Sequence, residues 1–427
     1  MASKQSDLVQ RNRAQSKRAQ EVIARCQQLA LFSEDELTTR RTFLSPPMQQ
    51  CHRQLTRWME PLGVQVRLDA VGNVRGFYPG TYSPRLIVGS HLDTIPDAGA
   101  YDGVLGVLLA LTLLEALEGR KLPFGIEIVG FSEEEGVRFQ TPFIGSRALV
   151  GRLDNELLNR EDKNGITLCQ AIQQFGLDPN QIPCAALSND TLGYIEFHIE
   201  QGPILEELGY ALGIVEAIVG QSRLEFTFTG RANHGGTTPM HLRHDAMAAA
   251  AQWITEVERA AIAVPGAVGT VGTLEAKPGV SNVIAGEVHL TLDVRHRSDE
   301  IRSQIVAQLI RKAEEISEHR RLRVRHSVLL SQQAVPMNGF LIDEIQLAIE
   351  KTGCVPHRML SGAGHDAMIL AEKVPAAMVF LRTPGGVSQH PAESVTEGDV
   401  EKAIECGLHL LDQLAASPVF LKRMVRA

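Results

Sequence analysis

The sequence predicts an α/β fold with a mostly parallel sheet, and three observations lead to this prediction. Short apolar runs at residues 86–88 and 126–131 have the length and the β-branched content of buried strands. Helical stretches separate such runs along the chain, which is the pattern of a parallel sheet. Polar residues that can carry chemistry follow the strands directly, and open α/β sheets place their ligands at these ends. We therefore expect the functional site at the carboxyl edge of the sheet.

Composition places the chain among ordinary globular proteins. It has 427 residues, 44% of them hydrophobic, and a formal net charge of −8. This length indicates more than one domain and suffices for large cores. The mild acidity gives no support to a nucleic-acid surface. The longest apolar stretch, residues 104–117, is shorter than the roughly 20 residues that span a bilayer, so neither nucleic acid nor membrane is an expected partner.

The cysteines and the N-terminus predict a cytoplasmic protein. The six cysteines include no close pair such as C-x-x-C, so they indicate neither a disulfide framework nor a zinc ribbon. Residues 1–20 are polar and lack the apolar core of a signal peptide. Both features are typical of a protein in a reducing compartment.

Periodicity predicts the elements of the main domain in order. The expected helices cover residues 17–30, about 47–61, a buried stretch after Asp102, 341–352 and 397–415. The expected strands cover residues 65–68, 73–78, 86–88, 126–131, 194–199 and 376–381.

The pattern changes after Gly213, which predicts a second domain inserted into the first. Two strand-like runs, a helix, two strands, a helix and a strand follow one another there. This order is typical of a ferredoxin-like α/β sandwich. We expect one domain from residues 1–212 and 331–427, and the inserted domain at residues 213–330.

The stretch from Leu86 to Gly103 contains the first candidate site. Its strand ends in His91 and Asp93, and a loop leads to Asp102 at the start of a long apolar helix. A neutral imidazole nitrogen and a carboxylate that can bridge two cations suit a metal site. In the alternative interpretation Asp102 is a helix cap and His91 is a hydrogen-bonded core residue. This stretch alone leaves both interpretations open.

Two further strand ends add candidates. Glu133, Glu134 and Glu135 follow the strand at residues 126–131, and crowded carboxylates repel one another unless a cation or a helix start relieves them. Because neighbouring side chains of an extended segment point to opposite sides, the three can have different roles. A solvated, acidic helix N-terminus is the simpler alternative. His198 ends a third strand and is either a satisfied core histidine or a third ligand.

Six segments of the chain carry a recognisable pattern: GSHLDT (89–94), YDG (101–103), EEG (134–136), HIEQGP (198–203), ANHGGTTPM (232–240) and GAGHDA (362–367). Together they resemble the hydantoinase/carbamoylase branch of the M20 metallopeptidase superfamily, over about residues 19–411. That branch contains allantoate amidohydrolases, N-carbamoyl-L-amino-acid hydrolases, β-ureidopropionases and ureidoglycolate amidohydrolases.

The resemblance implies a metal-binding catalytic domain with two divalent ions of the zinc, manganese or cobalt type. His91, Asp102 and His198 would hold one ion. Asp102, as a bridge, and Glu135 would hold the second. The inserted domain would act as a lid or dimerisation domain.

The resemblance also implies roles around these ions. Asp93 would orient His91, and Glu134 would be the general base that takes a proton from the attacking water and passes it to ammonia. His234 would stabilise the oxyanion in the partner's site of a homodimer. The implied substrate-binding residues are Gln221, Asn282 and Arg295, and the planar fork of Arg295 suits a carboxylate.

The last ligand motif departs from the family's pattern. Relatives have a Ser-His pair followed by Pro and Glu, whereas this chain has Ser388, Gln389, His390 and Pro391, with Glu393 beyond. Gapless alignment puts Gln389 at the ligand position, and an amide oxygen binds zinc-like ions more weakly than imidazole. Three outcomes are open: a backbone shift lets His390 coordinate, Gln389 binds weakly or through water, or the second site is partly or wholly empty. His390 is equally consistent with an ordinary loop histidine.

The implied activity is hydrolysis of the ureido (carbamoyl) C–N bond of a small carboxylate, such as allantoate or an N-carbamoyl amino acid, with release of ammonia and carbon dioxide. One alternative is an aminoacylase or peptidase of the wider superfamily, which would release no ammonia. Another is a metal-deficient, non-catalytic relative, an alternative suggested by Gln389.

Overall fold

The computed structural model describes residues 2–424, which form two compact units. One unit combines Met1–Glu216 with Met337–Ala427, and Ala217–Pro336 forms the other. The boundaries expected from the sequence fall inside two strands, β6 (Leu212–Ile218) and β12 (Arg323–Gln332). The hydrogen-bonded ladder between β6 and β15 (Ala376–Leu381) explains the first difference, because it holds β6 in the sheet of the first unit.

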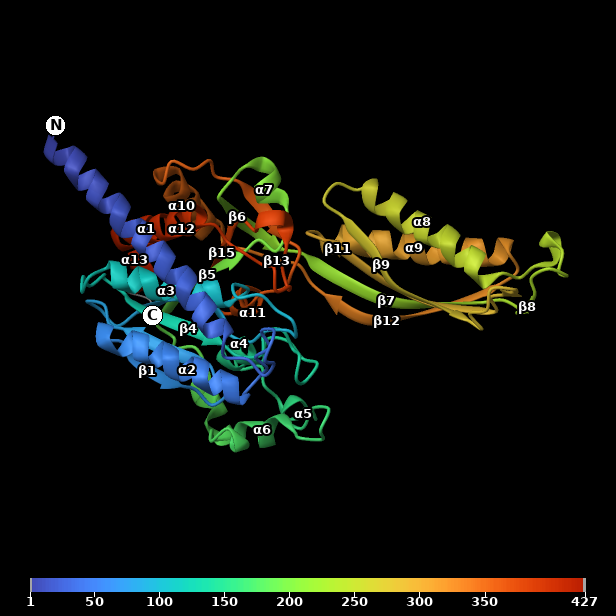
Figure 1. The fold of residues 1–427 in the computed structure, drawn as a ribbon, viewed down its shortest axis with the longest axis horizontal. Coiled ribbons are helices and arrows are strands. Elements are labelled where there is room, and N and C mark those ends of the chain that lie inside the picture. The colour runs from blue at the N-terminus through green and yellow to red at the C-terminus, as the bar shows by residue number, and fades with distance from the viewer. Residues whose placement is uncertain (1, 425–427) are drawn as a thin grey trace. The chain divides into compact units, whose positions relative to one another are not determined.

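A nine-stranded sheet forms the centre of the first unit (Figure 1). Its middle strands β4, β3, β5 and β15 run parallel, while the pairs β1–β2, β2–β4, β6–β15 and β6–β13 are antiparallel. The predicted α/β class and the parallel centre are therefore confirmed. In spatial order the strands are β1 (Gln65–Leu68), β2 (Val74–Tyr78), β4 (Gly125–Phe131), β3 (Arg85–His91), β5 (Thr191–Ile199), β15, β6 and β13 (Val335–Pro336), and β14 (Arg358–Ser361) pairs with β6.

The central strands are buried along their whole length, as expected for a parallel sheet covered by helices. Helix α3 (Val104–Ala116) packs closely on β5 because of Gly106, where a Cβ would lie 2.1 Å from the carbonyl oxygen of Phe197. The α-helices of this unit are α1 (Ala2–Ala30), α2 (Pro46–Met59), α3 (Val104–Ala116), α4 (Ile144–Leu149), α5 (Asn155–Leu158), α6 (Leu168–Gln174), α7 (Ile204–Leu208), α10 (Gly339–Lys351), α11 (Asp366–Leu370), α12 (Glu397–Ala416) and α13 (Pro418–Met424).

A buried ion pair joins strands β2 and β4. Arg75 Nε lies 2.7 Å from Glu127 Oε1, and both side chains are almost fully buried. Arg85 Nη1 lies 3.3 Å from the other oxygen of Glu127.

We expect Arg75→Met to lower the free energy of unfolding by about 3–5 kcal/mol, because the buried carboxylate of Glu127 loses its closest partner. Urea unfolding measures this loss, and replacing Glu127 as well should recover much of it; a single-variant loss below about 1 kcal/mol would contradict the expectation.

His52 in α2 gives the fold a dependence on acid. The side chain is buried, neither ring nitrogen has a hydrogen-bond partner among the described residues, and burial together with Arg41 lowers its pKa to about 3. In the unfolded chain a histidine takes up its proton near pH 6.5. Above pH 6.5, His52 therefore does not reduce the free energy of unfolding. As the pH falls from 6.5 toward 3, the free energy of unfolding decreases progressively, because only the unfolded chain binds the proton.

The variant His52→Leu should lack this dependence. Relative to the variant, the wild type should lose about 3 kcal/mol of unfolding free energy between pH 7 and pH 4. Denaturant titrations of both proteins at the two pH values measure the difference. Parallel losses in the two proteins would show that His52 is not the group responsible.

The second unit is an antiparallel sheet, and helices α8 (Ala246–Ile262) and α9 (Asp299–His319) cover one of its faces (Figure 1). The strand order β12–β7–β11–β9, with one helix after β7 and one after β11, is ferredoxin-like. Burial alternates strictly along β11, so its apolar residues face the helices and its polar residues lie on the open face. Trp253 fills the core, and its Nε1 donates to the carbonyl of Leu309 at 2.8 Å. The bounds are β7 (Gly220–Thr229), β8 (Asn233–His234), α8 (Ala246–Ile262), β9 (Val268–Lys277), β10 (Val283–Ile284), β11 (Glu287–His296), α9 (Asp299–His319) and β12.

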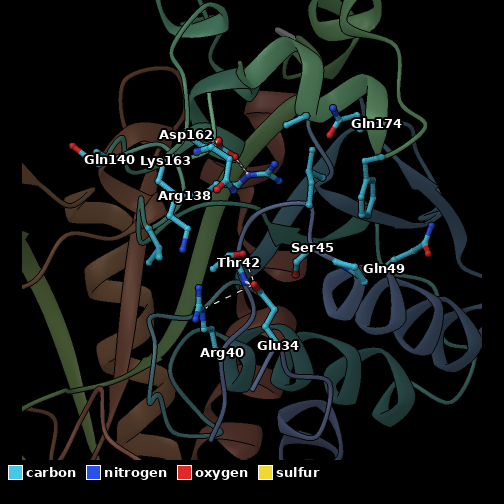
Figure 2. A pocket seen from close by; sticks show the side chains of 16 residues that line it. Glu34, Arg40, Thr42, Ser45, Gln49, Arg138, Gln140, Asp162, Lys163 and Gln174 are labelled. Atoms are coloured by element: carbon cyan, nitrogen blue, oxygen red, sulfur yellow. Dashed lines mark hydrogen bonds and ion pairs between the residues drawn. The ribbon is translucent and has the colours of Figure 1, made fainter. Parts of the chain in front are cut away.

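A cavity of about 740 Å³ opens on the first unit, and no predicted site residue lines it (Figure 2). Its charged side chains are largely paired with one another: Arg138 Nε lies 3.0 Å from Asp162, and Arg40 lies 4.0 Å from Glu34. We assign no ligand to this cavity.

Within residues 2–424, no helix combines the length and the apolar character needed to cross a bilayer.

Candidate metal centre

Two strand ends and one loop bring the first three predicted ligands to one edge of the main sheet. β3 ends at His91, and β5 ends one residue after His198. Since β3 and β5 are parallel neighbours, their carboxyl ends lie at the same edge. Asp102 comes from the loop that precedes α3. The structure therefore brings His91 and His198 together although they are 107 positions apart in the chain.

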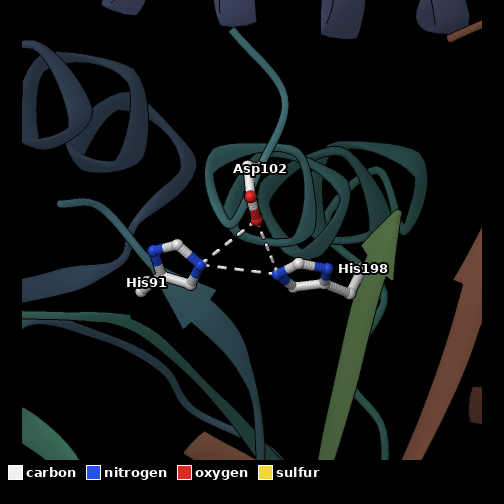
Figure 3. A group of neighbouring side chains, drawn as sticks. All are labelled: His91, Asp102 and His198. Carbon is white, nitrogen blue, oxygen red and sulfur yellow. Dashed lines mark hydrogen bonds and ion pairs between the residues drawn. The ribbon is translucent and has the colours of Figure 1, made fainter. Parts of the chain in front are cut away.

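The side chains of His91, Asp102 and His198 converge on one point (Figure 3). The two Nε2 atoms are 3.4 Å apart. Asp102 Oδ1 lies 3.6 Å from His91 Nε2 and 3.2 Å from His198 Nε2. A tetrahedral ion with bonds of about 2.0–2.1 Å separates its ligand atoms by about 3.3–3.4 Å. The three atoms thus have the spacing that a small divalent cation requires.

The other ring nitrogens determine which way the lone pairs point. His91 Nδ1 lies 3.0 Å from the carbonyl oxygen of Asp93, and His198 Nδ1 lies 2.9 Å from that of Ile199. Because a carbonyl oxygen only accepts, both Nδ1 atoms donate, and each neutral ring presents an Nε2 lone pair to the shared point. Asp102 Oδ1 is buried there and has no hydrogen-bond partner among the described residues. Three facing lone pairs in a buried position fit a bound cation.

Electrostatics around this point favour positive charge. Burial works against ionisation of Asp102, yet His198 and His91 hold its pKa well below the usual range. Burial also works against protonation of His91, but Asp102 and Glu134 raise its pKa well above 6.5. Asp102 raises the pKa of His198 in the same way, again against burial. A proton or a metal ion at this point is therefore stabilised by the same carboxylate.

Asp93 acts on the site through two different groups. It was expected to orient His91, and it does contact Nδ1, but through its backbone carbonyl; its carboxylate lies 3.7 Å from that nitrogen. The carboxylate instead accepts the backbone amides of Glu134 at 2.9 Å and Glu135 at 3.0 Å. Asp93 thus ties the segment after β4 to the end of β3.

Glu133, which received no role from the sequence, shapes the backbone after β4. Its Oε1 accepts the amides of Arg138 at 2.7 Å and Phe139 at 3.1 Å. Burial and the neighbouring Asp93 raise the pKa of this fully buried carboxyl to about 8. Because its carboxylate binds these two backbone amides, Glu133 has a structural role that differs from the roles expected of Glu134 and Glu135.

Glu134 and Glu135 belong to the surroundings of the ligand cluster. Burial raises the pKa of Glu134 well above its usual range, although the neighbouring His91 acts in the opposite direction. Burial and Asp102 raise the pKa of Glu135 to about 8. A buried carboxyl with a raised pKa is suited to accept and return a proton.

Gln389, and not His390, lies against Glu135. Gln389 Nε2 is 3.2 Å and 3.4 Å from the two carboxylate oxygens of Glu135. The side chain of His390 is exposed, and its Nδ1 accepts the amide of Ala392 at 3.1 Å. The cluster of His91, Asp102 and His198 does not include His390. Of the three open outcomes for this motif, the geometry disfavours coordination by His390. It favours the two in which Gln389 occupies the ligand position, with a weakly bound or an absent second ion.

Sequence reasoning missed the residues that hold the second oxygen and the backbone of Asp102. Gln201 Nε2 donates to Asp102 Oδ2 at 2.9 Å, and Ser388 Oγ lies 3.3 Å from the same oxygen. Glu393 Oε1 accepts the amides of Tyr101 and Asp102 at 2.8 Å and 2.9 Å. Both Gln201 and Glu393 lie within recognisable motifs, but their partners are 99 and 291 residues away, so spacing carried no signal for these contacts.

A second buried group lies behind His198. Ligand atoms of Glu196, His198 and His365 lie within 4.8 Å of one another. However, Glu196 accepts a serine hydroxyl and a backbone amide at 3.1 Å and 2.9 Å, and His365 Nε2 is 2.8 Å from Ser361 Oγ. Since these atoms are already engaged, we interpret this group as support for the position of His198.

In the second unit, the predicted substrate-binding residues Gln221 and Arg295 are direct neighbours across β7 and β11. Both contact Asp293, which sequence reasoning missed: Arg295 Nε and Nη2 lie 2.9 Å and 3.1 Å from its two oxygens. Burial opposes the ionisation of Asp293, but hydrogen bonds from Arg295 and Arg223 lower its pKa. The carboxylate thereby holds the guanidinium in one orientation.

His234 and Asn282 lie together at the ribbon of β8 and β10, where His234 pairs with Val283. The carbonyl of Asn282 accepts the amide of Gly235 at 2.7 Å. His234 is exposed, and its Nδ1 accepts the amide of Gly236 at 3.1 Å. The structure thus groups the four predicted residues of this unit into two pairs.

Comparisons with known proteins identify the family of this chain. Residues 87–413 match the model of peptidase family M20/M25/M40. The N-carbamoyl-L-amino acid amidohydrolase of Geobacillus stearothermophilus is 40% identical, over 84% of this chain and 89% of the relative. The probable allantoate deiminase of Oryza sativa subsp. japonica is 35% identical, over 92% and 88%.

A solved structure agrees in fold over nearly the whole length. The hydantoinase/carbamoylase family amidase from Burkholderia multivorans has a TM-score of 0.88 and 29% identity, and the match covers 94% of this chain and 98% of that one. This chain belongs to the M20/M25/M40 peptidase family, in its hydantoinase/carbamoylase branch.

Proposed function

We propose that this chain is a metal-dependent amidohydrolase that cleaves the ureido C–N bond of a small carboxylate, of the allantoate or N-carbamoyl amino acid class. The observation that carries the proposal is the buried convergence of His91, Asp102 and His198, with Glu134 beside it. The two relatives named above, amidohydrolase and deiminase, support the choice of bond. Hydrolysis of the ureido group releases ammonia and leaves a carbamate, which loses carbon dioxide to give the free amine.

The chain's own residues supply the proton transfers. A divalent cation, when bound, polarises the ureido carbonyl and lowers the pKa of a water molecule. Glu134 takes a proton from the attacking water as the new C–O bond forms, and it returns the proton to the nitrogen as the C–N bond breaks. Asp93 positions Glu134 through its backbone amide, and Gln201 keeps Asp102 in place.

The second unit would recognise the substrate. We assign Arg295 to the substrate carboxylate, because its guanidinium offers a planar pair of donors and Asp293 holds it in place. Gln221 and Asn282 would bind other polar groups of the substrate.

We further propose a cytoplasmic homodimer in which His234 stabilises the oxyanion in the partner's site. Two observations support the dimer: His234 is exposed, and strands β9 and β12 are the edges of the second unit's sheet, where unpaired backbone groups favour association. All six cysteines are free thiols, which is typical of a reducing compartment. Light scattering on the purified protein tests the dimer.

The activity is tested by an ammonia-release assay. Protein loaded with Mn²⁺, Co²⁺ or Zn²⁺ is incubated with allantoate, ureidoglycolate and a panel of N-carbamoyl-L-amino acids. The same acids carrying an N-acetyl group, and dipeptides, serve as controls. We expect ammonia from at least one ureido acid and none from the controls. Release of an amino acid from the N-acetyl compounds or dipeptides alone would instead indicate an aminoacylase or peptidase, and no turnover on either panel would contradict the proposal.

A further inference from the structure

We infer that this chain binds one divalent cation firmly, at His91, Asp102 and His198, and that Gln389 replaces a second cation by a hydrogen bond to Glu135. The inference deepens the proposed function, on which it rests for the role of the site. It concerns this chain's own residues, because the ligand position expected to be histidine is Gln389 here.

The first argument comes from the two oxygens of Asp102. A carboxylate that bridges two cations must offer one oxygen to each. Oδ1 faces the two Nε2 atoms and has no other partner among the described residues. Oδ2 is already occupied, since it accepts Gln201 Nε2 at 2.9 Å and lies 3.3 Å from Ser388 Oγ. One cation at Oδ1 therefore completes the contacts of the Asp102 carboxylate.

The second argument comes from the position where a second cation would lie. Glu135 there meets the Nε2 of Gln389 at 3.2 Å. An amide nitrogen has hydrogens to donate and no lone pair for a metal, so this pair satisfies the carboxylate without an ion. Turning the amide would place Gln389 Oε1 against the oxygens of Glu135, which repel it.

The third argument concerns His390, the neighbouring residue that could restore a nitrogen ligand. The backbone amide of Gln389 donates to Glu393 Oε2 at 3.3 Å, and Glu393 is in turn bound by the amide of Asp102. This link holds Gln389 toward the site and leaves the next residue outside it. His390 is exposed, with Nδ1 bonded to the amide of Ala392. His390 therefore does not replace the missing imidazole.

A single ion remains sufficient for the proposed chemistry. Catalytic zinc sites with three protein ligands and one open position hydrolyse amide bonds. His91, Asp102 and His198 are three ligands of this kind, and the buried carboxyl of Glu134, which interacts electrostatically with His91, is the general base of the proposed function. The replacement of the second ion by Gln389 thus changes the number of metals without removing the hydrolytic machinery.

Metal stoichiometry tests the inference without using activity. The full-length wild type, Gln389→His, Gln389→Glu and His390→Ala are stripped of metal and dialysed to equilibrium against micromolar Co²⁺ alone, and bound cobalt per chain is measured by mass spectrometry. Calorimetric titration with Co²⁺ counts the sites independently. We expect about one ion per chain for the wild type and for the matched control His390→Ala, and an increase toward two for Gln389→His and Gln389→Glu. Circular dichroism checks that each variant is folded.

Each outcome decides the matter. Two ions of similar affinity in the wild type would overturn the inference, as would a loss of one ion in His390→Ala. If both Gln389 variants are folded and still bind one ion, Gln389 does not exclude the second cation, and the inference is overturned. If a Gln389 variant does not fold, the wild-type count still decides. One bound ion together with no turnover on either substrate panel would leave the inference standing and refute the proposed function.

Discussion

Glu134→Gln is expected to lower kcat for ammonia release by roughly 10²–10⁴-fold, because a carboxamide cannot take a proton from water or return one to the leaving nitrogen. The side chain is buried beside His91, and burial raises its pKa. The replacement has nearly the same shape, so metal binding and folding should be preserved. Stopped assays on the active ureido acid, with bound metal measured on the same samples, give the effect.

The control for this variant is Glu207→Gln, an exposed position in α7. It should leave kcat unchanged. A Glu134→Gln enzyme that retains its metal and more than a tenth of the wild-type kcat would show that another group moves the proton. Loss of metal in this variant would instead place Glu134 among the ligands.

Removal of the metal is expected to abolish turnover and to lower the unfolding temperature. At a free metal concentration of 100 times Kd, an ion that binds only the folded chain adds about 2.7 kcal/mol to the free energy of unfolding. Without it, the buried ligand atoms of His91, Asp102 and His198 lose the cation on which they converge. Calorimetric scans with Co²⁺ and with a chelator measure the shift, which should be several degrees.

His198→Ala is the matched control for the chelation experiment. Because this variant loses one of the three ligands, its unfolding temperature should no longer respond to Co²⁺ or to the chelator. An equal response in both proteins would place the stabilising ion elsewhere. Re-addition of Co²⁺ to the stripped wild type should restore both the unfolding temperature and turnover.

The metal site also predicts a competition between protons and metal. Asp102 raises the pKa values of His91 and His198 against the effect of burial. Protons and the cation use the same lone pairs, so metal affinity falls as the pH falls through these raised values. The assays above are therefore best compared at a fixed pH above neutrality.

The fold class and the location of the site could be predicted from the sequence, because both depend on local patterns. Continuous apolar runs separated by helices predicted buried parallel strands, and β3, β4 and β5 are such strands. The strand ends His91 and His198 predicted ligands at one edge, where the structure brings them together. The place of β6 was harder to predict from the sequence, because it depends on pairing with strands that come much later in the chain, among them β15.

The sequence by itself determined the chemical inventory of this protein: which side chains can ligate, which follow strands, and that a glutamine stands where a histidine was expected. Only the tertiary structure decided how these groups share their bonds. In the structure, the carboxylate of Asp93 accepts hydrogen bonds from two backbone amides, and one oxygen of Asp102 accepts a hydrogen bond from Gln201. The carboxylate of Glu135 accepts one from Gln389. The physical reason is that each of these contacts joins loops far apart in the chain, so its distance depends on how strands and helices pack and not on spacing along the sequence.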